Sequence, residues 1–358
     1  MNILFQMVHP AKYHFHKKAI NNLLQNGHSV EVLIQTKDML EFLVKKEKWE
    51  YKNLFPSGRK ISFLPKLLSN IIILIITAYR QLKYVHNKSF DLFVGGELGI
   101  VGKFRDTPSI YVTDDDMYIT PQQHHACFLA THILTPEICD MTVYNKKRIT
   151  YKGYKALSHL HPNYFTPSID SLNPEIRNED YFLIRVCSYN SVHDIGGING
   201  IDDKTLIQLV HFLKDKGKIV LSNERKVPDE ILQYCISPEQ DNIENYIYYS
   251  KIFIGDSTTM CSEAAVLGTP SIEYDDWWYR CAQMLEIQER YKYNYGVKPG
   301  NIDALLETLE EILLAYSRDK ISKKELIDSI LKNCEDVSSF QTSLYSNYPS
   351  SLKINERN

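Results

Sequence analysis

The residues best placed to do chemistry lie in one segment, 252–274, in the last third of the chain. A buried strand at 252–254 is expected first, and a short helix of small residues at 260–267 follows the turn that ends it. Free backbone N–H groups and the positive end of the dipole make the start of such a helix an anion site. Glu263 lies four residues after Thr259, so both share one helix face. The turn is Gly255, Asp256, Ser257, Thr258 and Thr259.

This arrangement offers hydroxyl and N–H donors to phosphate oxygens, and a carboxylate one turn further to the hydroxyls of a sugar. It suits a nucleoside diphosphate. The alternative is an ordinary helix start in an α/β protein.

The segment resembles the donor-binding strand, turn and helix of GT-B-fold glycosyltransferases and UDP-N-acetylglucosamine 2-epimerases. Residues 1–315 further resemble an uncharacterised bacterial and archaeal family of 2-epimerase-like proteins. One shared motif is His-Pro-x-x-x-His-Phe, which here begins at His9 and includes His14. The other is of the Gly-Thr-Met-x-x-Glu-Ala type, which here occupies 258–264. The sequence departs from the usual paired glycines of the turn, since Ser257 and Thr258 stand there.

The resemblance implies a GT-B fold, in which two Rossmann-like domains with doubly wound parallel sheets face a cleft. It implies that the second domain binds a nucleotide sugar and that the final helix crosses back to the first domain. We expect metal-independent transfer of a sugar from a UDP-linked donor to a polysaccharide or lipid-linked acceptor. The donor is a substrate, and no cofactor or metal is expected.

Composition limits the class of protein. A chain of 358 residues suits two domains of about 160 residues. With 44% hydrophobic and 24% charged residues it is typical of globular proteins, and a net charge of −3 gives no argument for nucleic acid. The seven cysteines form no C-x-x-C pair, which favours free thiols in the cytoplasm over a disulfide framework or a zinc site. A strand at the very start predicts that there is no signal peptide.

Short apolar runs alternate with helical patterns in two series, which is typical of parallel, doubly wound sheets. We therefore expect a Rossmann-like acceptor domain at 1–165 and a second Rossmann-like domain at 181–335. Residues 166–180 are polar and contain two prolines, so they are interpreted as a linker. The polar residues 336–358 are expected to form a fraying tail.

Ligands of open α/β sheets bind beyond the carboxyl ends of the strands, so side chains that follow strands are the candidates. His9 follows the first strand and is the favoured general base, or else a helix cap. Glu97, after two glycines, is a second base or a solvated loop carboxylate. Asp114 opens a run of three aspartates that is catalytic or forms a turn. The resemblance also supports a role for His14 in substrate binding, or else His14 merely faces the cleft.

In the second half, Arg185 interrupts an apolar strand. Its guanidinium would hold a diphosphate, or would pair with a buried carboxylate. Ser188 and Ser222 follow two strands and would add hydrogen bonds. His193 and Asp194 lie in a glycine-rich loop that we expect to cover the donor.

Residues 67–78 are strongly apolar and lie among basic residues, but they are too few to span a membrane. They predict either a buried core helix or a helix that contacts anionic lipid at the inner face of the membrane.

Two rival functions remain. A 2-epimerase must act on both faces of the sugar, which would make Glu97 and Asp114 most important. The Gly-Thr-Arg-Pro-Glu-like start of such enzymes is missing after the first strand. The second rival function is that of a non-catalytic scaffold that binds nucleotide sugars.

Overall fold

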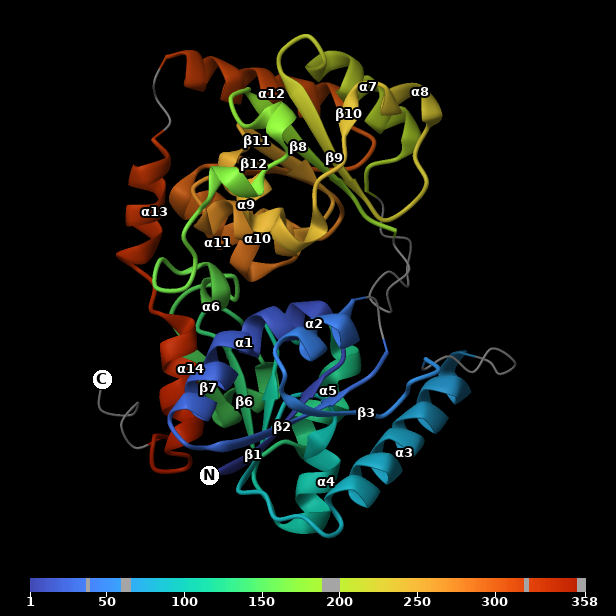
Figure 1. Ribbon diagram of the computed structural model, residues 1–358, viewed down its shortest axis with the longest axis vertical. Coiled ribbons are helices and arrows are strands. Elements are labelled where there is room, and N and C mark those ends of the chain that lie inside the picture. Colours follow the sequence, from blue (N-terminus) through green and yellow to red (C-terminus); the bar gives the residue numbers. More distant parts are fainter. Residues whose placement is uncertain (37–38, 59–65, 189–199, 319–321, 353–358) are drawn as a thin grey trace. The chain divides into compact units, whose positions relative to one another are not determined.

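The computed structural model describes residues 1–36, 39–58, 66–188, 200–318 and 322–352. The chain divides into two compact units, and each contains one parallel sheet (Figure 1). Unit 1 comprises Met1–His159 and Glu335–Asn358, and unit 2 comprises Leu160–Cys334. The predicted doubly wound α/β architecture is therefore confirmed.

The sheet of unit 1 has seven parallel strands in the order β3-β2-β1-β4-β5-β6-β7. Its central strands are short and apolar because both faces of the sheet are covered, as in β1, where Ile3, Leu4 and Phe5 are fully buried. The strand order reverses direction between β1 and β4, which makes this the switch point of the sheet. The strands are β1 (Asn2–Met7), β2 (Ser29–Ile34), β3 (Glu50–Asn53), β4 (Leu92–Val94), β5 (Ser109–Val112), β6 (His132–Pro136) and β7 (Arg148–Tyr151).

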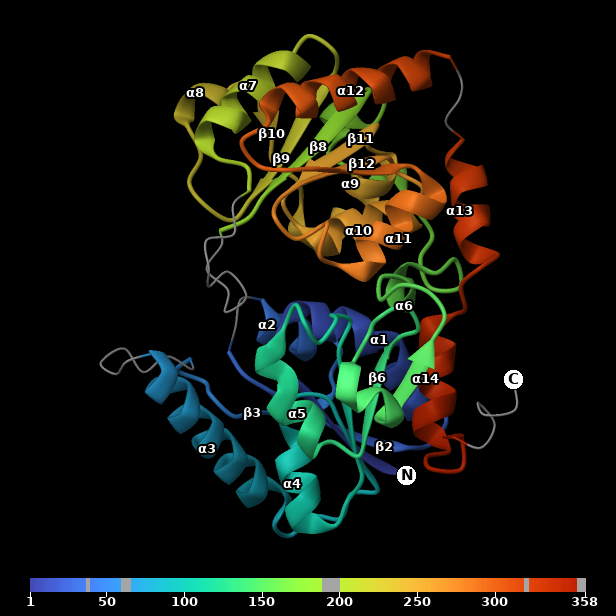
Figure 2. The ribbon, with the colours of Figure 1, turned by 180° about the vertical axis from the view of Figure 1, so that it is seen from behind.

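Two sets of helices cover this sheet. On one face α1 packs against α2 and α14, and on the other α4 packs between α3 and α5 (Figure 2). Right-handed crossovers on either side of the switch point place the two sets on opposite faces. The helices are α1 (Pro10–Gln25), α2 (Leu40–Lys46), α3 (Lys66–Val85), α4 (Leu98–Arg105), α5 (His124–Leu129) and α14 (Val337–Ser346), with the 3-10 turns η1 (Pro121–Gln123) and η2 (Thr142–Lys147). The short α6 (Leu157–Leu160) lies at the boundary of the units.

The sheet of unit 2 has six parallel strands in the order β10-β9-β8-β11-β12-β13, with its switch point between β8 and β11. One continuous apolar core packs the sheet against α7 and α12. The strands are β8 (Tyr181–Val186), β9 (Lys218–Asn223), β10 (Cys235–Ile236), β11 (Ile252–Gly255), β12 (Ser271–Tyr274) and β13 (Asn294–Val297). The helices are α7 (Asp203–Leu213), α8 (Asp229–Leu232), α9 (Ile243–Tyr249), α10 (Thr258–Val266), α11 (Ala282–Tyr291), α12 (Ile302–Ser317) and α13 (Lys323–Leu331), with 3-10 turns η3 (Ile169–Ser171), η4 (Pro174–Ile176) and η6 (Gln240–Asn242).

The segment 166–180, interpreted from its composition as a linker, packs within unit 2. Ile176 is buried, and the backbone N–H of Asn173 donates to the hydroxyl of Tyr246 at 3.0 Å. Two 3-10 turns, η3 and η4, give the segment its shape. These contacts of unit 2 were not visible in its polar composition.

The tail also differs from the expectation of fraying, because α14 forms in it and packs within unit 1. Gln341 hydrogen-bonds His16 at 3.0 Å, and Ser338 donates to the carbonyl of Ser158 at 2.6 Å. The ring of Tyr345 meets that of Phe5 edge-on, with centroids 5.6 Å apart. The final helix of the region 181–335, which was expected to cross back, is α13 and belongs to unit 2. The helix that joins unit 1 is α14.

The apolar stretch 67–78 lies in α3, which is buried on one side only. Ile73 and Thr77 face the core of unit 1, whereas Ile71, Ile75 and Tyr79 are exposed. The core-helix alternative does not describe it completely, because a core helix would bury its whole circumference. The alternative of lipid contact stays a prediction. In the described parts of the chain, no helix combines the length and apolarity that crossing a bilayer requires.

Candidate functional site

The strongest cluster of polar side chains lies at the carboxyl edge of unit 2, at the switch point between β8 and β11. Arg185 on β8 is paired in register with Ser222 on β9 and with Gly255 on β11. Its Nη1 donates to Ser222 Oγ at 2.7 Å, and its Nη2 forms an ion pair with Glu224. A Cβ atom at Gly255 would lie only 2.9 Å from the Cβ of Arg185, so this neighbour has to be glycine.

Glu224 completes the cluster, although no pattern in the sequence points to it. Its carboxylate accepts hydrogen bonds from the backbone N–H and the hydroxyl of Ser188, both at 3.2 Å. The fold thus brings together three predicted residues, Arg185, Ser188 and Ser222, around one exposed carboxylate. The ion-pair alternative for Arg185 is found, but Glu224 is not buried. Within the described residues the buried Nε of Arg185 has no hydrogen-bond partner.

Two residues of the predicted turn before α10 have different structural roles. Asp256 is buried, and its carboxylate accepts the N–H groups of Cys187 at 2.8 Å and of Ile201 at 3.1 Å. It therefore ties the end of β8 to the start of the next described segment. Ser257 caps α10 by accepting the N–H of Met260 at 3.4 Å. The assignment of both residues to substrate binding stays a prediction.

The start of α10 keeps the donors that an anion would need. In the described part of unit 2, no hydrogen-bond partner is found for the backbone N–H groups of Thr258 and Thr259, the first two residues of the helix. Glu263 follows one turn later and is buried. The predicted loop residues His193 and Asp194 lie outside the described residues.

Two buried carboxyl groups beside α10 were missed by the sequence analysis. Glu273 on β12 is paired in register with Gly255 and Gly296, and it is fully buried. Burial and the neighbouring Asp275 raise the pKa of Glu273 well above its usual value, which favours its protonated form. Burial also raises the pKa of Asp275 to about 6.

Asp275 also holds the tryptophan pair that follows β12. Its Oδ1 accepts the N–H groups of Trp277 at 2.7 Å and Trp278 at 3.1 Å. The indole of Trp278 lies against the backbone of Gly296, where a Cβ atom would come within 2.0 Å of the ring. Trp278 is thus packed against the protein, which is the commoner environment of a tryptophan side chain.

In unit 1 the three predicted catalytic residues follow three neighbouring strands. His9 comes after β1, Glu97 after β4 and Asp114 after β5, so they share the carboxyl edge of the sheet. His9 is the N-cap of α1, and its Nδ1 accepts the N–H of Ala11 at 3.2 Å. A neutral imidazole that accepts through Nδ1 carries its proton on Nε2. The assignment of His9 as general base stays a prediction.

Glu97 is held at the switch point by Gln6, a buried residue of β1 that the sequence analysis did not select. Gln6 Oε1 accepts the backbone N–H of Glu97 at 3.0 Å, and Gln6 Nε2 donates to the Glu97 carboxylate at 3.4 Å. Gly95 and Gly96 have positive φ, and a Cβ on either would come within 2.7 Å of Gln6. The two glycines therefore allow the close approach that positions Glu97.

Asp114 lies between two lysines. Lys155 Nζ is 3.0 Å from its carboxylate and Lys12 Nζ is 3.7 Å away. Burial alone would raise the pKa of Asp114, but Lys155 and Lys12 outweigh it and lower the pKa to about 2. Asp116, two residues on, accepts the N–H of Asp140 at 2.6 Å. The carboxylates of Asp114 and Asp116 thus contact different partners.

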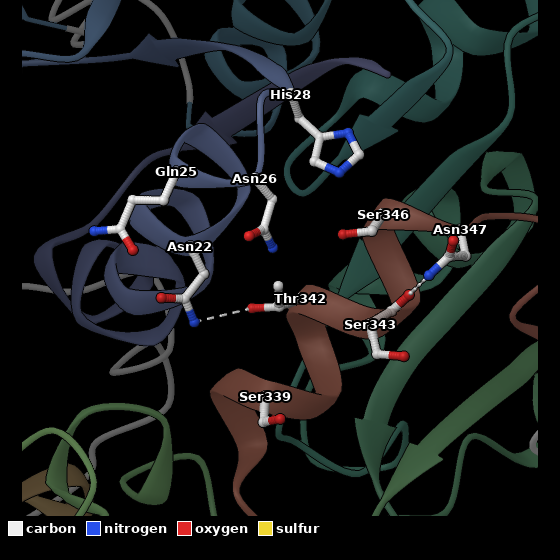
Figure 3. A pocket seen from close by; sticks show the side chains of 9 residues that line it. All are labelled: Asn22, Gln25, Asn26, His28, Ser339, Thr342, Ser343, Ser346 and Asn347. Atoms are coloured by element: carbon white, nitrogen blue, oxygen red, sulfur yellow. Dashed lines mark hydrogen bonds between the residues drawn. The ribbon is translucent and has the colours of Figure 1, made fainter.

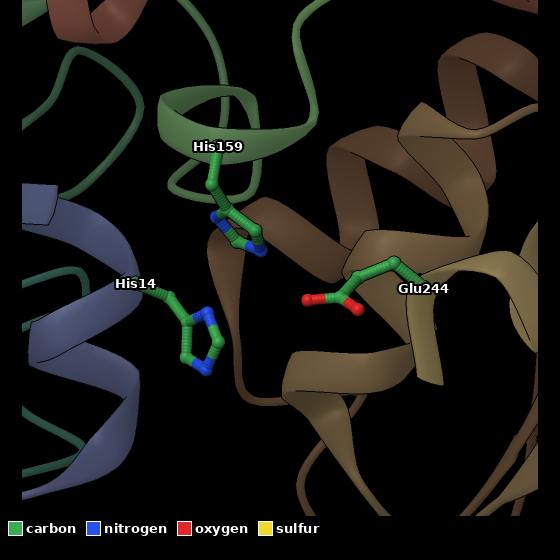
Figure 4. Close-up of side chains that lie close together, drawn as sticks. All are labelled: His14, His159 and Glu244. Atoms are coloured by element: carbon green, nitrogen blue, oxygen red, sulfur yellow. The ribbon is translucent and has the colours of Figure 1, made fainter. Parts of the chain in front are cut away.

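His14 on α1 packs beside His159, with ring centroids 5.2 Å apart, and both belong to unit 1 (Figure 4). Glu244 on α9, drawn in the same figure, belongs to unit 2. The ring of His14 also meets that of Tyr13 edge-on at 5.1 Å. These aromatic contacts place His14 in a packed environment.

A cavity of about 420 Å³ lies between the end of α1 and α14 (Figure 3). This part of unit 1 lies at the amino ends of the strands, opposite the edge where open α/β sheets bind ligands. It does not include any of the predicted site residues. Amide, hydroxyl and imidazole groups line it, from Asn22, Gln25, Asn26, His28, Ser339, Thr342, Ser343, Ser346 and Asn347.

Comparison with solved structures finds the same fold along the whole chain. A Listeria monocytogenes protein described as a candidate UDP-N-acetylglucosamine 2-epimerase matches with a TM-score of 0.68 and 9% identity, covering 98% of this chain and 97% of its own. The glycosyltransferase of kitacinnamycin matches at 0.64 and 10%, covering 96% and 98%. The UDP-GlcNAc 2-epimerase of Neisseria meningitidis, bound to UDP-GlcNAc, matches at 0.63 and 12%, covering 99% and 100%. The fold is therefore GT-B.

Among curated proteins no sequence match is found. The model of one family matches residues 8–330, which is most of the chain. The chain accordingly belongs to the family described as protein of unknown function DUF354.

Proposed function

We propose that this protein is a glycosyltransferase that binds a nucleotide sugar, UDP-linked in the first instance, at the carboxyl edge of unit 2. The observation that carries the proposal is the convergence of Arg185, Ser188 and Ser222 beside the start of α10, at the switch point of the sheet. Open α/β sheets bind their ligands at this point. Proteins of the same fold include a glycosyltransferase and a UDP-GlcNAc 2-epimerase bound to UDP-GlcNAc.

The two parts of the cluster suit the two parts of the donor. The N–H groups of Thr258 and Thr259, for which the described residues offer no partner, and the guanidinium of Arg185 would hold the diphosphate. Glu263, one turn along α10, would accept the ribose hydroxyls. When the sugar leaves, negative charge develops on the nucleoside diphosphate, and these fixed donors would stabilise it without a metal.

Unit 1 would hold the acceptor, a polysaccharide or a lipid-linked glycan. We assign the general base to Glu97, because Gln6 fixes it at the switch point of its sheet. The sequence favoured His9, but in this proposal the cap on α1, which uses its Nδ1, gives that residue a positioning role. Asp114 would be a weak general base, because its pKa is lowered to about 2.

Thermal unfolding against UDP, GDP, CDP and dTDP tests the donor site. A ligand at 100 times its Kd stabilises by about 2.7 kcal/mol, which raises the melting temperature by about 5–10 °C. We expect one nucleoside diphosphate to give this shift, and Glu263→Gln to reduce it. Glu289→Gln, an exposed change near the end of α11, is the matched control and should leave the shift intact. No shift with any of the four would refute the proposal.

The reaction is then distinguished by following the sugar by NMR with the nucleotide sugar so identified. Transfer or slow hydrolysis releases nucleoside diphosphate with the sugar configuration at C2 retained. Epimerisation inverts C2 and would replace the transferase assignment. Binding without turnover on any glycan would favour the scaffold.

A further inference from the structure

The outer face of α3, α4 and α5 exposes large apolar side chains in an unusual number. Ile75 is 63% exposed and Tyr79 is 65% exposed on α3, while Phe104 on α4 and Phe128 on α5 are 74% and 66% exposed. The three helices lie side by side on one face of the sheet of unit 1, with α4 in the middle (Figure 2). We call Ile71, Ile75, Tyr79, Phe104 and Phe128 the apolar face.

The inner side of α3 already meets the core of the unit, so the outer side is not needed for folding. Ile73 and Thr77 are buried, and Ile76 and Leu82 pack against the cluster that contains Leu98 and Val101 of α4. A surface helix normally presents polar residues on the opposite side. Here, one and two turns after Ile71, the same stripe continues through Ile75 and Tyr79. Grouped exposure of this kind marks an interaction surface.

Charge indicates what that surface meets. No aspartate or glutamate occurs in α3, α4 or α5. Lys83, Lys103 and Arg105 are exposed beside the apolar face, and none has an acidic partner among the described residues. The acidic residues Glu97 and Asp106 flank α4, one at each end.

The two units also differ in net charge. Unit 1 has 23 Lys and Arg against 16 Asp and Glu, a net charge of +7. Unit 2 has 18 against 28, a net charge of −10. The small net charge of the chain hides this asymmetry. An apolar surface with basic neighbours, on a basic unit, complements a membrane that carries anionic headgroups.

We propose that the apolar face of unit 1 docks on an anionic lipid bilayer, with Ile71, Ile75, Tyr79, Phe104 and Phe128 among the acyl chains near the headgroups. Lys83, Lys103 and Arg105 contact the lipid phosphates. The protein then binds the membrane surface peripherally. This goes beyond the proposed sugar transfer and does not depend on it, because the surface is distinct from both carboxyl edges.

Co-sedimentation of the full chain with vesicles tests this proposal. Vesicles of phosphatidylcholine with about one third phosphatidylglycerol should bind the protein, and vesicles of phosphatidylcholine alone should bind it about tenfold more weakly or not at all. Raising the salt from about 0.1 M to 0.5 M should weaken binding, because the Debye length shortens. Equal binding to both vesicles, or no binding to either, would overturn the proposal.

Variants locate the surface. Ile75→Glu and Lys83→Glu should each reduce binding to anionic vesicles about tenfold. Leu314→Glu on α12 is the matched control, since Leu314 is an exposed apolar residue of the acidic unit 2 and should leave binding unchanged. Melting temperatures without vesicles verify that each variant is folded. An equal loss in Leu314→Glu, or a concentration-dependent dimer that Ile75→Glu dissociates, would overturn the proposal.

Discussion

At the scale of single residues, burial decides the charge of the two carboxyl groups behind α10. An unfolded glutamate titrates near pH 4.3 and an unfolded aspartate near 3.9. In the fold the pKa of Glu273 is raised well above this range and that of Asp275 is raised to about 6. The folded state therefore binds these protons more tightly than the unfolded state. Their contribution to stability is complete at low pH and is lost as pH rises towards the folded values.

We expect the free energy of unfolding of wild type to fall relative to Glu273→Gln as pH rises from about 4.5 to 7, by about 1–3 kcal/mol. The glutamine keeps the shape of the side chain but does not titrate. Urea unfolding at several pH values measures the difference. Parallel pH profiles for the two proteins would show that Glu273 is ionised in the fold.

Local sequence was enough to select Arg185, Ser188 and Ser222, since each occurs at the end of an apolar strand. It could not select Glu224 or Gln6, because their partners lie 36 to 91 residues away. It also could not show that His9 caps α1 through Nδ1, because the geometry of the turn decides which nitrogen is used. Roles that depend on contact across strands require the fold.

At the scale of elements, the turn between β4 and α4 shows why two adjacent glycines precede Glu97. Gly95 has φ of +84°, and a Cβ there would lie 2.7 Å from the carbonyl oxygen of Gln6. Gly27, after α1, has a similar φ of +80° but open space around it. A comparison of Gly95 with Gly27 therefore separates the effect of backbone strain from the effect of a steric clash.

Gly95→Ala should destabilise the protein by about 1–3 kcal/mol more than Gly27→Ala does, because both add strain at positive φ but only Gly95→Ala adds a clash. Equilibrium unfolding in urea measures both changes. If the two variants lose the same stability, the close approach to Gln6 has no energetic weight.

The alternating strands and helices were predictable because buried parallel strands have continuous apolar runs. Helix α14 was not, since its four serines and one threonine resemble a loop. Its stability comes from tertiary contacts, such as those of Gln341 with His16. The environment of the half-buried α3 was also ambiguous, because an apolar run does not indicate which side of the helix meets the core.

At the scale of the whole molecule, unit 1 is built from two separate stretches of the chain, because residues from 335 onward return to it. This return could be anticipated only from the resemblance to GT-B proteins. The charge asymmetry of the units was equally hidden, since a net charge of −3 is the difference of two large opposite charges. Both features depend on where the units divide.

Tyr345→Ala should therefore destabilise unit 1, by about 3–5 kcal/mol, although the residue lies near the end of the chain. Its side chain is fully buried against Phe5 of β1. Ser343→Ala, exposed on the same helix, is the control and should have little effect. Calorimetry and urea unfolding report the change. A Tyr345→Ala protein as stable as wild type would mean that α14 is dispensable for unit 1.

The central claim is that unit 2 binds a nucleoside diphosphate through Arg185 and the start of α10. Titration calorimetry with UDP, and with GDP, CDP and dTDP if UDP fails, tests it most directly. We predict that wild type binds one of them and that Arg185→Lys, which keeps the charge but loses the planar fork, binds it about 10- to 100-fold more weakly. Glu289→Gln should bind like wild type. Equal affinity of wild type and Arg185→Lys, or no binding of any of the four, would contradict the account.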